Sequence, residues 1–345
     1  MPIEYRALPT QVVEVDVEKH ISIHTMDDVE SRRAHIIRYL WKGRGLPATM
    51  PAVEQGVGMP AELAGLTGVS LVTRLSVPMR YGVGATMYLV HPRTPPIRRL
   101  GIHHTGHGED PVVRLPPVQA LLDVGYIVLC CDMPFVGWNT QRIQTVGDPS
   151  TYLDLGRGVA AHNRLAAYES PTFTPLTYWL EPLAVAVNYV QATLRPRSIS
   201  MVGLSGGGWT TTAYSAIDPR ITRSYPTAGS LPAFLHTASL GSQGDYEQEA
   251  LTAPGFYAHA GLLDLYAMGA IGPRRGGQLQ ILNRFDRCCF WSVSHRSYAP
   301  VVSHRVALAG EGHWDVLEDA THDKHQISPY ALDVILWDQE HNPPD

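Results

Sequence analysis

The sequence predicts an α/β protein with a mostly parallel central sheet and helices on both faces. Three observations favour this class. Short apolar segments typical of strands alternate with longer segments of helical period, as in sheets covered on both sides. At residues 199–208 an apolar strand leads through a Gly-x-Ser-x-Gly turn into a helix-like segment. The hydrophobic content of 44% over 345 residues is enough for a substantial core.

Composition excludes several classes of partner. The net charge of −5 gives no reason to expect nucleic acid or an anionic membrane surface. No stretch approaches the roughly 18 consecutive apolar residues of a transmembrane helix, and the first residues lack the pattern of a signal peptide. We therefore expect a cytoplasmic protein that acts on a small molecule. A homo-oligomer is compatible with this composition.

The first 68 residues are predicted to form an N-terminal extension. Residues 12–17 alternate apolar and acidic side chains like a strand. Asp27 or Asp28 is expected to cap a helix that ends at Trp41 before Gly43 and Gly45. Residues 46–68 are rich in Pro and Gly and are expected to be irregular.

The main domain is predicted to run from residue 69 to residue 345. It opens with a hairpin of residues 69–77 and 85–90. Further strands are expected at 98–103, 126–131, 199–204, 223–226, 278–283 and 314–317, and helices at 118–124, 176–194, 209–217, 298–308 and 328–337. Within this domain, residues 229–277 form a cap-like insert.

Ser205 is the predicted nucleophile. The sharp turn between strand and helix places the serine in a strained backbone conformation, so Gly203 and Gly207 are needed where side chains would clash. The N-terminus of the following helix favours developing negative charge.

A serine hydroxyl needs a base, and the base needs an acid that orients it. In proteins with a Gly-x-Ser-x-Gly turn between a strand and a helix, the serine is followed along the chain by the acid, Asp or Glu, and then by the histidine. Asp286 follows the strand at 278–283 by a short loop and is the predicted acid, with Asp264 and Asp315 as weaker candidates. The final loops offer His313, His322 and His325 as bases.

The segment from His325 to Leu332 narrows this choice. Its sequence, His-Gln-Ile-Ser-Pro-Tyr-Ala-Leu, resembles the His-x-Ile-Ser-Pro-x-x-Leu stretch of the phospholipase/carboxylesterase branch of the α/β-hydrolase superfamily. The resemblance extends loosely from Leu100 to Trp337. It implies the α/β-hydrolase fold, with His325 as the catalytic base.

The same resemblance implies an oxyanion hole. One donor is the backbone N–H of Gly206, and the other belongs to the loop at residues 102–108. Relatives carry His-Gly-x-Gly there, so His103 corresponds to their histidine and His104 replaces their first glycine. We therefore name Thr105 as the second donor, with His104 next.

The histidines of this loop also raise a competing hypothesis. His103, His104 and His107 are possible zinc ligands, with a shell completed by Glu109, Asp110 or Asp132. We favour the interpretation without a metal or any other cofactor. The segment 132–137 resembles the family's Asp-x-Pro-x-x-Gly turn, in which the aspartate is structural.

The insert allows two interpretations. Its acidic run 244–249 and its aromatic residues Phe234, Phe256, Tyr257 and Tyr266 either line a pocket or form a packing element with a solvated face. Trp209 is expected to pack. The pairs Cys130-Cys131 and Cys288-Cys289 are predicted to be reduced packing residues at the ends of core strands.

The expected function is hydrolysis of a carboxylic ester through Ser205, His325 and Asp286, with an acyl-enzyme intermediate. Peptidase, thioesterase or acyltransferase chemistry on the same triad is the first alternative, because these residues do not encode the acceptor or the leaving group. A non-catalytic binding protein on a hydrolase fold is the second.

Overall fold

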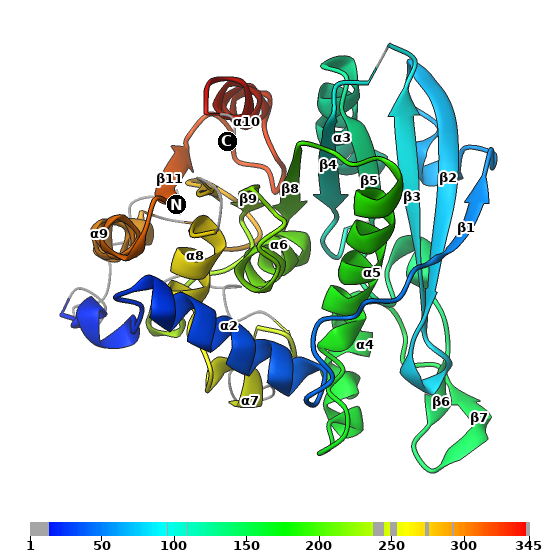
Figure 1. The fold of residues 1–345 in the computed structure, drawn as a ribbon, viewed down its shortest axis with the longest axis horizontal. Coiled ribbons are helices and arrows are strands. Elements are labelled where there is room, and N and C mark those ends of the chain that lie inside the picture. The colour runs from blue at the N-terminus through cyan, green and yellow to red at the C-terminus, as the bar shows by residue number, and fades with distance from the viewer. Residues whose placement is uncertain are drawn as a thin grey trace.

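The fold is built around one large mixed sheet (Figure 1). The computed structural model describes residues 14–94, 96–108, 110–236, 245–248, 254–272, 276–291 and 293–342. The nine strands lie in the order β1-β2-β3-β5-β4-β8-β9-β10-β11. The sheet pairs antiparallel from β1 to β5 and parallel from β5 to β11. The predicted mostly parallel sheet is confirmed.

The strands follow the apolar segments closely. Their bounds are β1 Ala52–Gln55, β2 Val69–Pro78, β3 Gly84–Pro92, β4 Arg99–His104, β5 Ile127–Cys131, β8 Ser198–Leu204, β9 Arg223–Thr227, β10 Gly277–Asn283 and β11 His313–Asp319. Every residue of β5 is buried, as expected for a strand covered on both faces. The parallel strands β4, β8, β9 and β10 therefore end at the same edge of the sheet, where candidate site residues follow them.

Helices cover both faces of the sheet (Figure 1). Helices α3 (Pro111–Asp123) and α10 (Pro329–His341) lie on one face. The other face carries α5 Thr177–Thr193, α6 Gly206–Ile217, α8 Leu262–Ala270 and α9 Ala299–Ala309. The Ser328 hydroxyl caps α10 by accepting from the Ala331 amide, as the sequence predicts, and Asp110 starts α3 earlier than expected by accepting from Val112.

The N-terminal part differs from expectation in two places. Helix α2 (Met26–Leu40) is capped by Thr25, with Asp28 returning the bond to the Thr25 amide, and not by an aspartate at the cap position. Residues 46–68 are not wholly irregular, because β1 pairs with β2 at the sheet edge. Of the strand expected at 12–17, residues 12 and 13 lie outside the described residues, and Val17 begins the 3-10 helix η2 (Val17–His20).

Several short elements were not expected. Strands β6 (Ile143–Thr145) and β7 (Asp148–Leu153) form a separate two-stranded sheet, and α4 (Gly158–Arg164) follows it. The insert contains α8 and the single turn α7 (Pro254–Tyr257). The remaining 3-10 turns are η3 Ala61–Leu63, η4 Arg80–Gly82, η5 Gly137–Asn139, η6 Leu165–Tyr168, η7 Ala233–Leu235 and η8 Ser294–Ser297.

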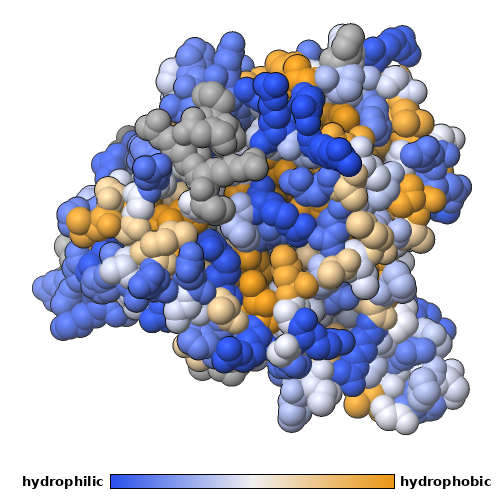
Figure 2. Space-filling model, in the orientation of Figure 1, coloured by the Kyte–Doolittle hydropathy of each residue, from blue (hydrophilic) through white to orange (hydrophobic). Residues whose placement is uncertain are grey.

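On the face shown in Figure 2, hydrophobic residues form groups separated by hydrophilic ones. The exposed large hydrophobic residues lie on separate elements, such as Val112 on α3, Leu308 on α9 and Trp337 on α10. None of the helices in the described ranges is long and apolar enough to cross a bilayer.

Candidate active site

Ser205 stands at the turn between β8 and α6. Its backbone has φ 59° and ψ −126°, a strained conformation for a residue with a side chain. A methyl group on Gly203 would lie 2.1 Å from the Gly207 carbonyl oxygen, and one on Gly207 would lie 2.1 Å from that of His104. Neither position therefore accepts a side chain, which explains the glycine spacing of the motif.

Asp286 and His325 meet as predicted. Nδ1 of His325 lies 2.7 Å from Oδ2 of Asp286, whose side chain is fully buried. Oδ1 of Asp286 accepts the backbone amides of Cys288 at 2.7 Å and Cys289 at 3.3 Å. The side-chain amide nitrogen Nδ2 of Asn283, the last residue of β10, donates to Asp286 Oδ2 at 3.2 Å. The carboxylate is thus fixed in place, and it fixes the imidazole.

Ser205 and His325 line the same small cavity, of about 70 Å³. The remaining lining residues are His103, Thr105, Gly106, Gly108, Val113, Arg114 and Leu204. Nε2 of His325 is buried and has no hydrogen-bond partner among the described residues. The imidazole nitrogen opposite Asp286 is therefore available to act as a base.

The alternative bases and acids have other roles. His322 lies 3.3 Å from Asp319, which also holds Thr321 and Ser328. His313 is the first residue of β11, at the end of the strand away from the site. Asp264 accepts the Ser22 amide at 2.7 Å and so anchors the N-terminal segment, and exposed Asp315 bonds its neighbouring amide at Val316.

The loop after β4 places Gly106 against Ser205. A methyl group on Gly106 would lie 2.5 Å from Ser205 Cβ and 3.1 Å from its Oγ. The Thr105 amide donates to the Cys131 carbonyl at 3.1 Å, and His104 belongs to strand β4 with its Nδ1 2.9 Å from the Thr105 carbonyl oxygen. Because the Thr105 amide is already used within the fold, the expectation that it is the second oxyanion donor needs correction, and Gly106 is better placed.

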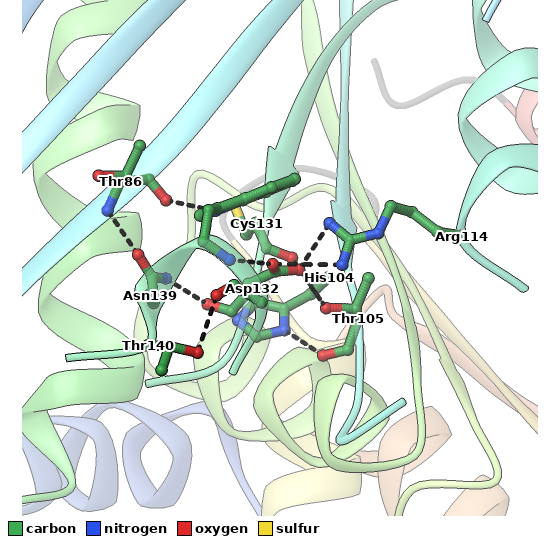
Figure 3. Close-up of polar contacts among 10 residues, drawn as sticks. Thr86, His104, Thr105, Arg114, Cys131, Asp132, Asn139 and Thr140 are labelled. Atoms are coloured by element: carbon green, nitrogen blue, oxygen red, sulfur yellow. Dashed lines mark hydrogen bonds and ion pairs between the residues drawn. The ribbon is translucent and has the colours of Figure 1, made fainter. Parts of the chain in front are cut away.

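Asp132 contacts Thr105 and Arg114 beside this loop (Figure 3). Its carboxylate is 2.9 Å from Arg114 Nη1 and accepts the Thr105 hydroxyl at 2.6 Å. Burial raises the pKa of Asp132, and the neighbouring guanidinium opposes that rise. A methyl group on Gly137 would lie 1.9 Å from Asp132 Oδ2. The aspartate of the Asp-x-Pro-x-x-Gly turn therefore has a structural role, as the resemblance implies. We call the contacts of Asp132 with Arg114 and Thr105 the Asp132 clamp.

Solved structures share this architecture. One is a methylesterase, 17% identical, with a TM-score of 0.64 over 99% of this chain and 70% of its own. An acetyl xylan esterase from Thermoanaerobacterium sp. is 14% identical, with a TM-score of 0.54 over 96% and 98%. A glucuronoyl esterase from Teredinibacter turnerae is 15% identical, with a TM-score of 0.56 over 96% and 89%. The chain has the α/β-hydrolase fold. No protein-family profile and no curated protein sequence matches it.

Within this α/β-hydrolase fold, the two histidines that end β4 and the one in the loop after it do not gather as the zinc hypothesis requires. His103 and His104 are buried, and burial lowers the pKa of His103 to about 3 and that of His104 to about 4, so both imidazoles are neutral near pH 7. His107 turns instead toward His162 and Asp245. Asp132 is held by Arg114, and Glu109 lies outside the described residues.

The described part of the hydrolase insert packs and does not line the cavity at Ser205. Tyr266 stacks with Tyr298 and with Trp314, which also contact each other. Phe256 contacts Trp209. Trp209 is fully buried, as expected, and donates to the Tyr257 hydroxyl at 2.8 Å. Residues 244 and 249 of the acidic run lie outside the described residues.

The cysteine prediction is right for one pair and wrong for the other. Cys130 and Cys131 are free and buried in β5. Cys288 and Cys289 form a disulfide with each other. They lie in the loop beyond Asp286 and not at the end of β10, and Cys288 is exposed, so core packing does not account for them.

Proposed function

We propose that this chain is a serine hydrolase that cleaves a carboxylic ester through Ser205, His325 and Asp286. One observation carries the proposal. Ser205, in its strained backbone conformation, lines the same small cavity as His325. Nδ1 of His325 is 2.7 Å from the buried carboxylate of Asp286, which also accepts the backbone amide of Cys288. This is the arrangement by which a neutral hydroxyl becomes a nucleophile.

In the proposed reaction the Ser205 Oγ attacks the acyl carbon while Nε2 of His325 takes the hydroxyl proton. The resulting imidazolium is stabilised by the Asp286 carboxylate at Nδ1. Collapse of the tetrahedral intermediate breaks the bond to the alcohol oxygen, which receives the proton from His325. Water then attacks the acyl-enzyme by the same route and regenerates the serine.

The developing oxyanion is proposed to bind two backbone N–H groups. Gly206 is the first residue of α6, so its amide lies at the helix N-terminus and points away from the helix. Gly106 supplies the second, because its backbone lies against Ser205. Donors of this kind contribute on the order of 3 kcal/mol each to the transition state.

The comparisons support ester chemistry over the other reactions of this triad. The three structures described above are all named as esterases, and together they cover nearly the whole chain. Their names concern methyl, acetyl and glucuronoyl esters. A first substrate panel therefore contains an aryl acetate, an acetylated xylo-oligosaccharide and methyl glucuronate.

Steady-state kinetics of matched variants tests the proposal. Ser205→Ala and His325→Ala are each expected to lower kcat by at least about 10³-fold with an unchanged circular dichroism spectrum. His322→Ala is the matched control, because that histidine lies in the same loop but is held by Asp319. Near-normal turnover by His325→Ala together with loss in His322→Ala would reassign the base.

A further inference from the structure

A second cluster of polar side chains lies beside the proposed site, outside the catalytic triad. It consists of His107, His162, Asp245 and Glu247, which come from the loop after β4, from α4 and from the insert. One nitrogen or oxygen atom of each lies within 4.8 Å of those of the other three. Residues up to 140 positions apart therefore converge on one point.

The spacing of these atoms is close to that of a coordination shell. Nε2 of His107 is 3.0 Å from Nδ1 of His162 and 2.5 Å from Oδ2 of Asp245. Nδ1 of His162 is 3.5 Å from the same Asp245 oxygen and 3.7 Å from Oε2 of Glu247. Four donors about 2.0–2.2 Å from a tetrahedral ion stand roughly 3.3–3.6 Å apart. The His107–Asp245 contact of 2.5 Å has to widen by about 1 Å to admit an ion.

The hydrogen bond on the other side of the His162 ring also supports a metal site. Its Nε2 lies 2.7 Å from the carbonyl oxygen of Pro134, which can only accept a hydrogen bond, so Nε2 carries the proton. In the neutral ring Nδ1 then keeps a lone pair directed at the cluster, where it faces His107 Nε2 at 3.0 Å. Histidines that bind metals in proteins are oriented by such an outer hydrogen bond.

The charge balance also favours a cation. The side chains of His162 and Glu247 are fully buried, and that of Asp245 is 8% exposed. Carboxylates removed from water need a compensating positive charge. Two carboxylates and two imidazoles meet here, with the ion pairs of Asp245 running to both imidazoles and that of Glu247 to His162.

We propose that His107, His162, Asp245 and Glu247 form a binding site for a divalent transition-metal ion, with Zn²⁺ as the best match. Two imidazoles and two carboxylates in a compact, buried shell suit Zn²⁺ better than Mg²⁺ or Ca²⁺, which prefer six or more oxygen ligands. The site joins three segments. His107 belongs to the proposed oxyanion loop and also lies against the start of α6, since a methyl group on Gly206 would be 3.2 Å from its Cε1. Bound metal therefore ties this loop to α4 and the insert.

Calorimetric titration of the metal-stripped full chain with Zn²⁺ tests the proposal. We expect one ion per chain and a rise in the melting temperature on binding. Asp245→Asn, which keeps the size of the side chain, is expected to weaken binding at least about 10²-fold, and His162→Ala at least as much. His304→Ala removes an exposed histidine of α9 and should leave binding unchanged.

Two controls separate this site from the cysteine-containing cluster and from the hydrolytic reaction. Cys288, Cys289 and His325 are the other group of possible ligands among the described residues, so a Cys288→Ser/Cys289→Ser variant must retain the ion. Bound Co²⁺ should give a tetrahedral absorption spectrum without a thiolate charge-transfer band. Ser205→Ala must bind the metal like wild type, which keeps this test independent of the proposed hydrolysis. Absence of saturable binding, or binding that Asp245→Asn leaves intact, would overturn the proposal.

Discussion

Residue 137 decides whether the Asp132 clamp can form. The carboxylate of Asp132 reaches Arg114 and Thr105 because Gly137 has no side chain and adopts φ +55°. Thr105 in turn begins the loop whose next residue, Gly106, lies against Ser205, the proposed nucleophile. A missing methyl group thus helps to position the oxyanion loop.

Gly137→Ala should therefore destabilise the fold and lower turnover. The methyl group would overlap Asp132 Oδ2 and the backbone would be strained, so we expect a loss of about 2–4 kcal/mol in the free energy of unfolding. Gly147→Ala is the control, because Gly147 also has positive φ but no atom within 4 Å of the added methyl group; about 1 kcal/mol is expected there. Denaturant unfolding measures both. Equal losses of unfolding free energy in Gly137→Ala and Gly147→Ala would show that the Asp132 clamp adds nothing to stability.

Asp286→Asn tests how the imidazole is oriented. Asparagine keeps the size of the side chain but can present an N–H to Nδ1 of His325, which favours the wrong tautomer. We expect kcat to fall by about 10³- to 10⁴-fold with little change in KM. Asp264→Asn, a change to the other carboxylate considered as the acid, should retain turnover, because Asp264 anchors Ser22. The reverse pattern would reassign the acid.

At the scale of single residues, local motifs predict the strained turn at Ser205 and the helix start after His325, and they miss contacts between distant segments. The turn around Ser205 and the cap at Ser328 depend on neighbours in sequence. Whether the Thr105 amide is free depends on Cys131, 26 positions away on another strand. The cluster at His107 depends on residues 55 to 140 positions away, so sequence spacing gives no signal for it.

At the scale of elements, a buried arginine of α2 bonds to the ends of two helices of the main domain, in addition to the apolar contacts of α2. Nε of Arg33 donates to the Ala216 carbonyl at 2.9 Å, at the end of α6. Its Nη2 donates to Met268 and Ile271 at the end of α8. A cation that meets two helix C-termini is favoured by both helix dipoles.

Arg33→Met should loosen this attachment. The substitution keeps an apolar stem but leaves buried carbonyl groups without their donor, so we expect the free energy of unfolding to fall by about 2–3 kcal/mol. Arg38→Met on the exposed side of α2 should stay within about 0.5 kcal/mol of wild type. Urea unfolding of the two variants is the measurement. A similar small change in both would mean that Arg33 does not secure the helix.

Elements with a clear hydrophobic period were predictable, and those without one were not. Helix α5 buries most of its residues and matches its predicted range within one residue. Strand β1 is exposed along its whole length, and so is β7, so neither carries an alternating pattern. Their strand conformation comes from pairing with a neighbour.

At the scale of the whole molecule, two buried neutral histidines make stability depend on pH. The pKa values of His103 and His104 are lowered by burial to about 3 and about 4. In the unfolded chain both titrate near 6.5. Below pH 6.5 the unfolded state therefore binds protons that the folded state does not, and the folded state loses stability as the pH falls toward 4.

His103→Gln should flatten this dependence. Each buried neutral histidine contributes a slope of up to about 1.4 kcal/mol per pH unit between pH 6 and 4, and the variant removes one such slope. Urea unfolding at pH 7, 6, 5 and 4 gives the comparison, with exposed His304→Gln as the control. Parallel curves for His103→Gln and wild type would show that His103 takes up its proton in the folded state.

The central claim is that Ser205 is an activated nucleophile. Intact-mass analysis after treatment with a fluorophosphonate tests it most directly, because this reagent bonds to activated serines whatever the natural ester is. We predict a single adduct on wild type and none on Ser205→Ala. An unlabelled, folded wild type, or an adduct that persists in Ser205→Ala, would contradict the account and favour a binding protein on a hydrolase fold or another reactive residue.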